Sequence, residues 1–317
     1  MLKNKKISVI LPIYNEEGNI KKIIEEINKV LNNNYNYEII TVDDGSGDKS
    51  LVVLKEQAKL NQKIKVISFT KNFGQTAALY AGIENSTGDI IVLIDSDLEN
   101  DPNDIIMLIN KLDEGYDVIS GWRDSRWSGS WLTRKLPSVI ANWLISKISG
   151  LKLHDYGCTL KVYKKKVIKN IQLYGEMHRF IPIYSFWQGG KITEMKVNYR
   201  KRIYGKSNYG IYRTFRVLLD LILMKFLEKY INRPIHFFGG IGFISFFIGI
   251  SFGFLAVLLK IFNIRHLIAT PLPILSTLFI IVGIQLIAMG IIAEMIMRTY
   301  FEAQNKKPYN IKNKINF

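Results

Sequence analysis

Two long apolar runs constrain this chain more than any other feature. No Asp, Glu, Lys or Arg occurs in residues 235–259 or in residues 267–293. Each run is longer than the roughly 20 apolar residues with which a helix crosses a bilayer. A wholly soluble fold is therefore excluded, and the sequence predicts a hairpin of two transmembrane helices, over about residues 235–259 and 270–296.

The basic residues gather on either side of these runs. The chain has 43 Lys+Arg against 27 Asp+Glu, a formal charge of +16, which fits nucleic acid, an anionic membrane or a phosphorylated substrate as partner. Cations crowd residues 200–233 and 298–314, whereas only Lys260 and Arg265 lie in the connection between the runs. By the positive-inside rule we expect an integral membrane protein whose soluble part and both termini are cytoplasmic. Because the charge follows the membrane boundaries, a nucleic-acid partner is excluded.

The residues before the first run alternate between strand and helix patterns. Residues 7–13 are almost continuously apolar, which is typical of a strand buried on both faces of a parallel sheet, and residues 19–31 carry apolar side chains at spacings of three and four. Further predicted strands and helices follow at 37–42, 50–60, 64–69, 75–85 and 89–94. The pattern predicts an α/β fold, a mainly parallel sheet flanked by helices, with its ligand beyond the carboxyl ends of the strands.

Amphipathic segments complete the predicted organisation. Residues 210–230 oppose apolar residues to cations, which is typical of a helix lying in the interface of a bilayer, and residues 131–148 form another amphipathic candidate. The expected parts are a cytoplasmic domain over 1–209, an interfacial helix region over 210–234, the hairpin over 235–297 and a basic cytoplasmic tail over 298–317. The glycines of Gly249-Ile-Ser-Phe-Gly253 have a spacing that permits close helix packing, or that a membrane helix merely tolerates.

A run of acidic residues follows the fourth predicted strand. Asp95 and Asp97 alternate about the end of this strand, so both can face one cation, and Glu99 can add a third oxygen. Such carboxylates suit Mg²⁺ or Mn²⁺, because these ions bind through one or two carboxylates together with phosphate oxygens of a substrate. The other interpretation is an acidic loop that caps the next helix.

Two adjacent carboxylates, Asp43 and Asp44, end the second predicted strand. They repel each other, a cost that is understandable if one of them accepts hydrogen bonds from a nucleobase or ribose. The alternative is an acidic turn in which Gly45 supplies the tight geometry. Neither a Gly-x-Gly-x-x-Gly pattern nor a Walker lysine loop occurs, which argues against a dinucleotide dehydrogenase and a P-loop NTPase.

The motifs, taken in order, resemble those of glycosyltransferase family 2. They are similar above all to membrane-anchored polyprenyl-phosphate glycosyltransferases, such as dolichol-phosphate mannose synthase and the bactoprenol glucosyltransferases. The matching strings are Leu11-Pro-Ile-Tyr-Asn-Glu-Glu, Val42-Asp-Asp-Gly-Ser, Phe73-Gly-Gln, Asp95-Ser-Asp-Leu-Glu, Gly121-Trp-Arg, Asp155-Tyr-Gly-Cys and Arg202-Ile-Tyr-Gly-Lys-Ser, followed by the two apolar runs. The resemblance implies a GT-A-type nucleotide-sugar-binding domain and a metal-dependent transferase.

The resemblance also implies roles for individual residues. The donor nucleotide would contact Pro12, Tyr14, Glu16, Asp43, Asp44, Gly74, Asp95 and Ser96. Asp95, Asp97 and Glu99 would hold Mg²⁺ or Mn²⁺, although the family commonly has Gln in place of Glu99, and phosphates would contact Arg123, Arg202 and Lys206. Asp155 and Asp97 would be catalytic. Because a phosphomonoester has its second pKa near ~6 and is already ionised, Asp155 would orient the acceptor or the sugar rather than act as a base.

The implied reaction is an inverting transfer of a sugar from a UDP- or GDP-sugar to undecaprenyl or dolichyl phosphate. Its product would be a β-linked polyprenyl-phosphate sugar, and residues 173–180 would face the acceptor or the sugar. A polysaccharide synthase of the same superfamily is one alternative, although two spans are too few for a channel within one chain. A noncatalytic membrane scaffold with a nucleotide pocket is another. The expected partners are a nucleotide-sugar donor, a lipid acceptor and the membrane, and a homo-oligomer stays open.

Overall fold

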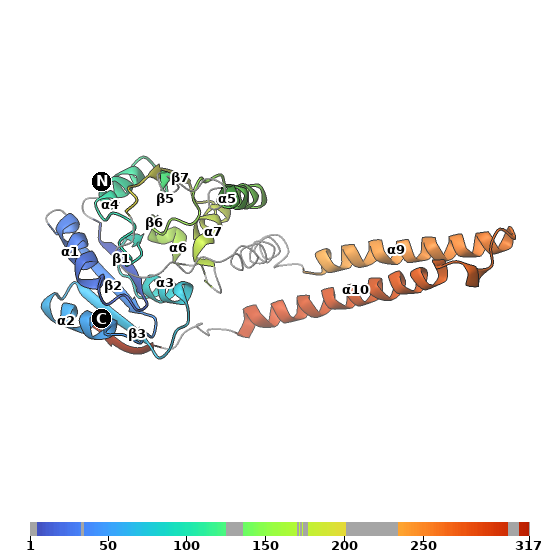
Figure 1. The fold of residues 1–317 in the computed structure, drawn as a ribbon, viewed down its shortest axis with the longest axis horizontal. Coiled ribbons are helices and arrows are strands. Elements are labelled where there is room, and N and C mark those ends of the chain that lie inside the picture. The colour runs from blue at the N-terminus through green and yellow to red at the C-terminus, as the bar shows by residue number, and fades with distance from the viewer. Residues whose placement is uncertain are drawn as a thin grey trace. The chain divides into compact units, whose positions relative to one another are not determined.

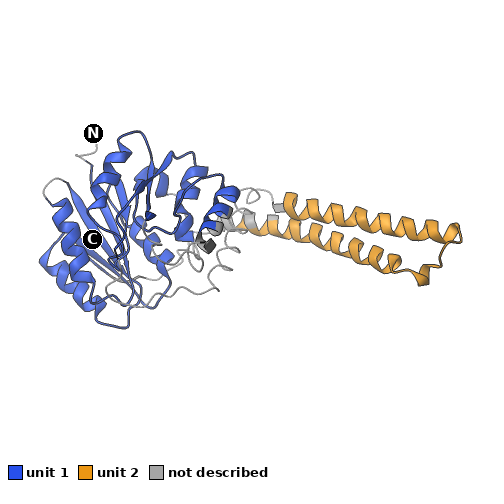
Figure 2. Cartoon of the chain, turned by 45° about the horizontal axis from the view of Figure 1, so that its top comes forward, with its two compact units in different colours: residues 1–221, 307–317 blue, residues 222–306 orange. Residues whose placement is uncertain are grey.

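The chain forms two compact units (Figure 2). The computed structural model describes residues 5–32, 35–124, 136–169, 171, 173, 177–200, 234–303 and 311–316. Unit 1 comprises Met1–Leu221 together with Lys307–Phe317, and unit 2 comprises Ile222–Lys306. Arg202, Lys206 and the interfacial helix predicted over 210–234 lie outside the described residues.

The described part of unit 1 is built on an eight-stranded sheet with the order β7-β5-β6-β4-β1-β2-β3-β8. The strands are β1 (Ile7–Ile13), β2 (Tyr37–Asp43), β3 (Ile64–Phe69), β4 (Ile90–Leu93), β5 (Val118–Trp122), β6 (Lys161–Lys164), β7 (Ile192–Lys196) and β8 (Ile311–Ile315). Parallel pairing joins β1 to β2 and β4, β2 to β3, and β5 to β7. Strand β6 runs antiparallel to β4 and β5, and β8 runs antiparallel to β3. The predicted mainly parallel α/β sheet is confirmed, with β6 and β8 as its reversed strands.

Helices cover both faces of this sheet (Figure 1). They are α1 (Ile20–Leu31), α2 (Ser50–Leu60), α3 (Gln75–Glu84), α4 (Asp104–Leu112), α5 (Leu136–Ser149), α6 (Lys165–Ile168) and α7 (Ile181–Trp187), with a 3₁₀ turn, η4 (Met177–Phe180), before α7. Helix α1 buries the apolar stripe predicted for it: Ile20, Ile23, Ile24, Ile27 and Leu31. Of the helix predicted over 131–148, the structure describes the part that begins at Leu136.

Alternate residues of the central strands enter two separate cores. Val9 of β1 packs with α1, α2 and α4 on one face, whereas its neighbour Ile10 packs with α3, α6 and α7 on the other. Successive residues of a strand point to opposite faces, so both faces must be apolar when both are covered. Every residue of β1 and β2 is accordingly buried. The polar loops therefore lie outside these two cores, at the carboxyl ends of the parallel strands.

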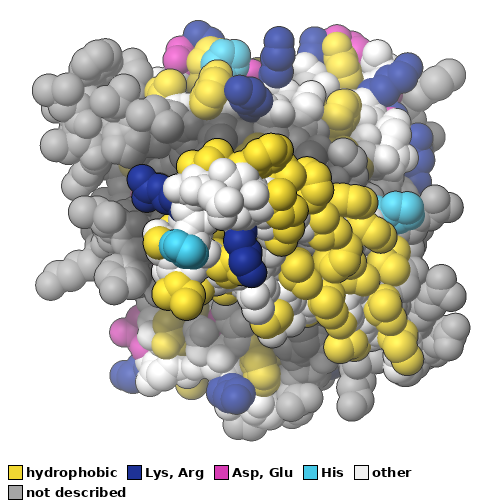
Figure 3. Space-filling model, turned by 90° about the vertical axis from the view of Figure 1, so that its right-hand side faces the viewer, with side chains coloured by type: hydrophobic (Ala, Val, Ile, Leu, Met, Phe, Trp, Pro, Cys, Tyr) yellow, Lys and Arg dark blue, Asp and Glu magenta, His cyan; other side chains and the backbone are white. Residues whose placement is uncertain are grey.

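Unit 2 is a pair of long apolar helices. Helix α9 (Pro234–Ile261) and helix α10 (Leu272–Ala303) are joined through the 3₁₀ turn η5 (Leu267–Ala269). Mean hydropathy is 2.4 over both Ile235–Ile261 and Leu272–Ala293, and only 22% and 17% of the most apolar windows are buried. A core helix of a soluble protein would be mostly buried, whereas hydrophobic side chains dominate the surface of these helices (Figure 3). Both predicted apolar runs thus form helices long enough to cross a membrane.

Small residues bring the two helices into close contact. A Cβ on Gly242 would lie 2.7 Å from the carbonyl oxygen of Gly283, and a Cβ on Gly249 would lie 2.7 Å from a side-chain carbon of Ile280. The Ser276 hydroxyl donates a hydrogen bond of 2.8 Å to the Gly249 carbonyl. Backbones can approach this closely only where side chains are small. Close packing at Gly249, one of the two interpretations of its spacing, is the observed one.

Part of the predicted basic tail is a strand. Residues Ile311–Ile315 pair with β3 as β8, the Lys314 Nζ donates to Asn85 Oδ1 at 2.6 Å, and Asn316 Nδ2 donates to the carbonyls of Ala58 and Ile64 at 3.0 and 3.1 Å. A short strand rich in Lys and Asn resembles a solvated tail in sequence, although lysine is common on sheet edges. Consequently, segments of unit 1 both precede α9 and follow α10.

Candidate active site

The loops after β1, β2 and β4 are tied together at the carboxyl ends of these adjacent strands. Asn15 Oδ1 accepts a hydrogen bond of 2.8 Å from the Gly47 amide, and the Asn15 amide donates to Ser46 Oγ at 3.0 Å. Ser96 Oγ donates to the carbonyl of Pro12 at 3.1 Å. Three segments that lie far apart in the sequence therefore share one edge of the sheet, where the predicted donor residues were expected to meet.

Asp44 orders the loop after β3. Its side chain is buried, and its two carboxylate oxygens accept hydrogen bonds from the amides of Phe73 (2.7 Å) and Gly74 (2.9 Å). Burial and the negative charge of Asp43 raise the pKa of Asp44. The two hydrogen bonds lower it, but by less, so the pKa is raised overall. Asp44 thus positions Gly74, another predicted nucleotide contact.

The turn between β2 and α2 depends on a glycine. Gly45 has φ +66°, and a Cβ at this position would lie 2.4 Å from the carbonyl carbon of Lys71. Any other residue would combine a rarely adopted backbone conformation with a backbone clash. On the neighbouring strand, the predicted donor contacts Tyr14 and Glu16 follow β1, and half of the Tyr14 surface is exposed to solvent. An exposed aromatic ring at this edge can stack on a nucleobase.

The acidic segment after β4 is electrostatically strained. Gln75 Nε2 donates to Asp95 Oδ1 at 2.7 Å. Burial, followed by the negative charges of Asp97 and Glu99, raises the pKa of Asp95 to about 7, although a hydrogen bond from Thr159 acts in the opposite direction. The nearby charge of Arg123 lowers the pKa of Asp95 but does not outweigh burial and the neighbouring carboxylates, a condition that a bound cation relieves.

The backbone turns sharply within this segment. Leu98, which is buried, has φ +62°, a conformation that costs energy for a residue with a branched side chain. Asp97 Oδ1 accepts a hydrogen bond of 3.0 Å from the Glu99 amide across this turn. Strained residues of this kind persist where the surrounding structure holds them, often at functional sites.

The donor set fits a divalent ion that arrives with a substrate. Within the described ranges, no cluster of three acidic, histidine or cysteine side chains is arranged to hold a metal by itself. The Glu99 carboxylate instead lies 3.9 Å from Nη1 of Arg123. Mg²⁺ characteristically takes one or two carboxylates plus phosphate oxygens and water, so Asp95 and Asp97 with a diphosphate form an adequate set. Glu99 is placed to modulate Arg123 as well as the ion.

Arg123 and Asp155, predicted separately to bind phosphate and to orient substrates, are partners. Arg123 Nε lies 2.8 Å from Asp155 Oδ2, and Nη2 lies 3.2 Å from Oδ1. Oδ1 of Asp155 also accepts the amide of Gly157 at 3.0 Å. The Arg123 side chain is only 4% exposed. This two-point pair holds the Asp155 carboxylate in one orientation.

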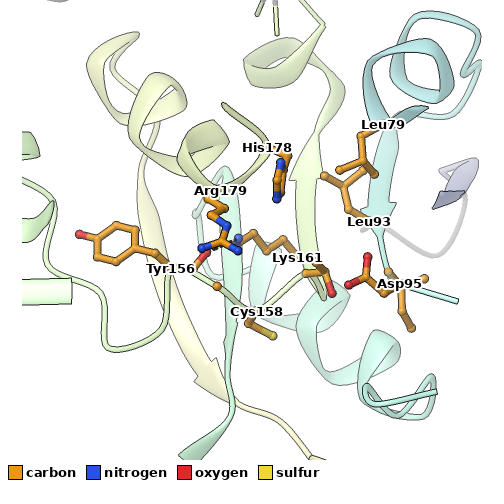
Figure 4. A pocket seen from close by; sticks show the side chains of 11 residues that line it. Leu79, Leu93, Asp95, Tyr156, Cys158, Lys161, His178 and Arg179 are labelled. Carbon is orange, nitrogen blue, oxygen red and sulfur yellow. Dashed lines mark hydrogen bonds between the residues drawn. The ribbon is translucent and has the colours of Figure 1, made fainter. Parts of the chain in front are cut away.

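A small cavity beside this pair contains residues that were not predicted for the site (Figure 4). It encloses about 10 Å³, the space of one water molecule, and is lined among others by Asp95, Thr159, Lys161, His178 and Arg179. Lys161 is buried in the short strand β6. Its neighbours in the sequence are apolar, and no motif marks it as a functional residue. Arg179 belongs to the 173–180 segment that was expected near the acceptor or the sugar.

The cationic residues of this cavity affect each other. Lys161 Nζ donates to the carbonyl of Tyr156 at 3.0 Å, and burial, with the charges of Arg123 and Arg179, lowers its pKa to about 8. Burial and the same kind of repulsion lower the pKa of His178 to about 3, so its ring is neutral and hydrogen bonds with Thr76 Oγ1 at 2.8 Å. Through its hydrogen bond to the Tyr156 carbonyl, the buried Lys161 therefore supports the turn that carries Asp155.

The chain is similar along nearly its whole length to two bacterial sugar transferases. It is 39% identical to a dodecaprenyl-phosphate galacturonate synthase of Rhizobium johnstonii, over 96% of this chain and 92% of the relative. It is 30% identical to an undecaprenyl-phosphate 4-deoxy-4-formamido-L-arabinose transferase of Aeromonas hydrophila subsp. hydrophila, over 97% and 93%.

Unit 1 is also similar in fold to a solved structure. Glucosyl-3-phosphoglycerate synthase from Mycobacterium tuberculosis, in complex with Mn²⁺ and UDP-glucose, superposes with a TM-score of 0.57 at 18% identity, over 71% of this chain and 80% of that protein. This likeness confirms the GT-A-like α/β fold. The sequence profile of glycosyl transferase family 2 matches residues 8–172. On these grounds the chain belongs to glycosyl transferase family 2.

Proposed function

We propose that this glycosyltransferase moves a sugar from a nucleoside diphosphate donor to a polyprenyl phosphate in the membrane, with inversion at the anomeric carbon. The observation that carries the proposal is the 96% coverage of the chain by its match to a dodecaprenyl-phosphate sugar synthase. That match extends over the two apolar helices. A transferase that acts on a water-soluble acceptor would not require these helices. A polysaccharide synthase and a noncatalytic scaffold are both less well supported by it.

On the donor side, Asp95 and Asp97 would hold Mg²⁺ or Mn²⁺ against the diphosphate, with Glu99 beside them. The raised pKa of Asp95 supports a cation here, and a protein of the same fold binds Mn²⁺ with UDP-glucose. When bound, the ion supplies positive charge to the departing diphosphate. The nucleoside would lie against Pro12, Tyr14, Glu16, Asp43, Asp44, Gly74 and Ser96.

In the transfer step, an ionised oxygen of the acceptor phosphate forms a bond to the anomeric carbon as the bond from that carbon to the diphosphate breaks. The nucleoside diphosphate leaves with the electron pair. Asp155, held by Arg123, orients the reacting groups, and its fixed charge supports the positive charge that develops on the sugar. No proton needs to be removed from the acceptor, because its phosphate is already ionised.

For the membrane part, α9 and α10 would cross the bilayer with unit 1 in the cytoplasm. The cations that flank the apolar runs support this orientation. Arg202 and Lys206 are further proposed phosphate ligands, and residues 210–234 a proposed interfacial helix. Assembly into a homo-oligomer stays a prediction of the sequence.

The test is transfer of label to lipid. The purified full-length chain, incubated with radiolabelled UDP- and GDP-sugars, undecaprenyl phosphate and Mg²⁺ or Mn²⁺, is expected to carry label into the organic phase from at least one donor, and a chelator is expected to stop this. Asp97→Asn should lower turnover at least about 100-fold, because it removes a carboxylate that holds the ion.

Asp113→Asn is the matched control, because Asp113 is an exposed acid just after α4 and should be dispensable. If no donor labels the lipid with the wild-type chain, the proposed function is wrong. If Asp97→Asn turns over at the wild-type rate, the assignment of the metal site is wrong.

A further inference from the structure

The acceptor phosphate needs a cation that the donor side does not provide. In an inverting displacement the attacking group approaches opposite the leaving diphosphate, so the metal on Asp95 and Asp97 cannot neutralise both. Arg123 was predicted as a phosphate ligand together with Arg202 and Lys206, which lie outside the described residues. The Nε and Nη2 atoms of Arg123, however, are directed at Asp155, and Nη1 faces Glu99. Among the residues that the structure describes, a cation other than Arg123 is therefore expected on the acceptor side of the site.

We propose that Arg179, with Lys161 behind it, binds the phosphate group of the lipid acceptor. This inference rests on the proposed function, and it assigns a contact that the resemblance did not supply. Arg179 belongs to η4, and Lys161 to β6, which pairs with β4 through Lys161 and Leu93, two residues before Asp95. Both side chains line the cavity that also reaches Asp95 and Thr159 (Figure 4). The pair thus lies between Asp95 and the turn that carries Asp155 (Figure 4).

The charges around this pair favour an anion. Lys161 and Arg179 are near enough to act on each other electrostatically, and Asp155, the carboxylate that acts on Lys161, is already paired with Arg123. Within the part of the chain that the structure describes, no carboxylate or carbonyl oxygen accepts a hydrogen bond from the Arg179 guanidinium. The buried Lys161 and the partly exposed Arg179 repel each other, so a phosphate beside them would convert a repulsion into an attraction.

The shape of the site indicates which of the two residues touches the phosphate. The enclosed space of about 10 Å³ is too small for a phosphate group. Lys161 is only 2% exposed, whereas Arg179 is partly exposed. The phosphate therefore meets Arg179 at the open side, where the planar guanidinium can form two hydrogen bonds to its oxygens. Lys161 contributes charge from within and keeps the Tyr156 carbonyl in place.

Kinetics of variants distinguish this phosphate from the donor diphosphate. With the full-length chain in detergent, Arg179→Gln is expected to raise the KM for undecaprenyl phosphate about 10-fold or more, since hydrogen bonds to charged groups are lost, while the KM for the donor stays within about 2-fold. Arg179→Lys should recover part of the loss. Lys161→Gln, which keeps a donor for Tyr156, should raise the acceptor KM by a smaller factor. Lys111→Gln, which removes a surface charge paired with Glu114, should change neither constant.

Direct binding separates this inference from the proposed function. Calorimetric titration of the wild-type chain with geranyl phosphate, without donor, should show binding that weakens about 10-fold in Arg179→Gln, while binding of UDP with Mn²⁺ stays unchanged and reports an intact fold. If geranyl phosphate binds in this way but no donor gives transfer, the proposed function fails and the inference stands. If transfer occurs but Arg179→Gln leaves acceptor KM and geranyl phosphate binding unchanged, or weakens donor binding equally, the inference is overturned.

Discussion

At the scale of single residues, the pairing of Arg123 with Asp155 changes how both are understood. The sequence suggested one phosphate ligand and one catalytic carboxylate, whereas the structure shows a nearly buried two-point ion pair. Removing one partner of such a pair leaves the other charge uncompensated in the interior, which costs more than the intact pair contributes. In the proposed mechanism, Arg123 therefore positions Asp155.

Asp155→Asn tests this interpretation. The amide keeps the size of the carboxylate but lacks its charge. Only one of its two terminal atoms, the oxygen, can accept a hydrogen bond from Arg123. We expect kcat to fall at least about 100-fold, because stabilisation of developing charge is lost, while the KM for the donor changes little. Initial-rate measurements with saturating lipid acceptor check this.

Arg123→Lys is the complementary variant, because it keeps the charge and loses the two-point geometry. Its kcat should lie between those of the wild type and Asp155→Asn. A wild-type kcat in Asp155→Asn would contradict a role for this carboxylate in the reaction.

Sequence analysis could find residues that stand at strand ends, but not contacts between remote segments. Asp44, Asp95 and Asp97 were recognisable because they directly follow apolar strands that are easy to predict. The Arg123–Asp155 pair spans 32 residues and depends on β5 pairing with β6, a short strand with lysine at both ends. Lys161 reaches the cavity through the pairing of β6 with β4, which could not be predicted, whereas Arg179 lies in the 173–180 segment expected near the acceptor or the sugar.

At the scale of elements, strands differ in how far their own residues determine them. Strands β1 and β2 are apolar throughout, so burial on both faces can be read from their sequence. Strands β6 and β8 carry lysines and have four and five residues, so their strand conformation depends on the partner strand rather than on intrinsic preference. This is why the reversed strands β6 and β8 were missed while β1 to β4 were predicted. The parallel pair β5 and β7 was not predicted either.

Glu38 provides a pH-dependent link between strands. This buried residue of β2 accepts a hydrogen bond from Ser8 of β1 and lies 3.1 Å from the ammonium group of Lys65 of β3. Burial alone would raise its pKa, but hydrogen bonds from Ser8 and Thr87 and the neighbouring Lys6 and Lys65 lower it to about 2. The ionised form is therefore the one that the fold stabilises.

A lowered carboxyl pKa stabilises the folded state above the unfolded-state pKa, and this stability is lost as pH falls toward the folded-state pKa. For Glu38 the window runs from about pH 4.5 down to about pH 2, and the shift corresponds to about 3 kcal/mol. We expect Glu38→Gln to be less stable than the wild type at pH 7. The difference in unfolding free energy should shrink by about 2 kcal/mol at pH 3, as measured by denaturant unfolding of both proteins in detergent. A difference that does not depend on pH would refute the link.

At the scale of the whole molecule, chain connectivity bears on membrane topology. Strand β8 follows α10 and pairs with β3, which precedes α9. Residues on both sides of the hairpin therefore belong to one folded unit, so we expect them on the same side of a membrane if α9 and α10 cross it. The positive-inside rule makes the same prediction from charge and adds that this side is the cytoplasm.

Accessibility of introduced cysteines tests the topology. The chain has a single cysteine, Cys158, which is buried and provides a low background. Ile268→Cys, in the fully exposed connection between the helices, should react with a membrane-impermeant maleimide added to intact cells. Lys22→Cys in α1 and Lys314→Cys in β8 should react only after the membrane is opened. Labelling of Lys22→Cys in intact cells would overturn the orientation.

The place of β8 also has a consequence for biosynthesis. Roughly 240 residues separate β3 from β8, including both apolar helices, so at about 5–20 residues per second the ribosome delivers β8 some 10–50 s after β3. During that interval β3 presents an unpaired edge on which other chains could pair. A delay in inserting the hairpin would therefore prolong the time during which the nascent chain can aggregate, and would link membrane insertion to the yield of folded enzyme.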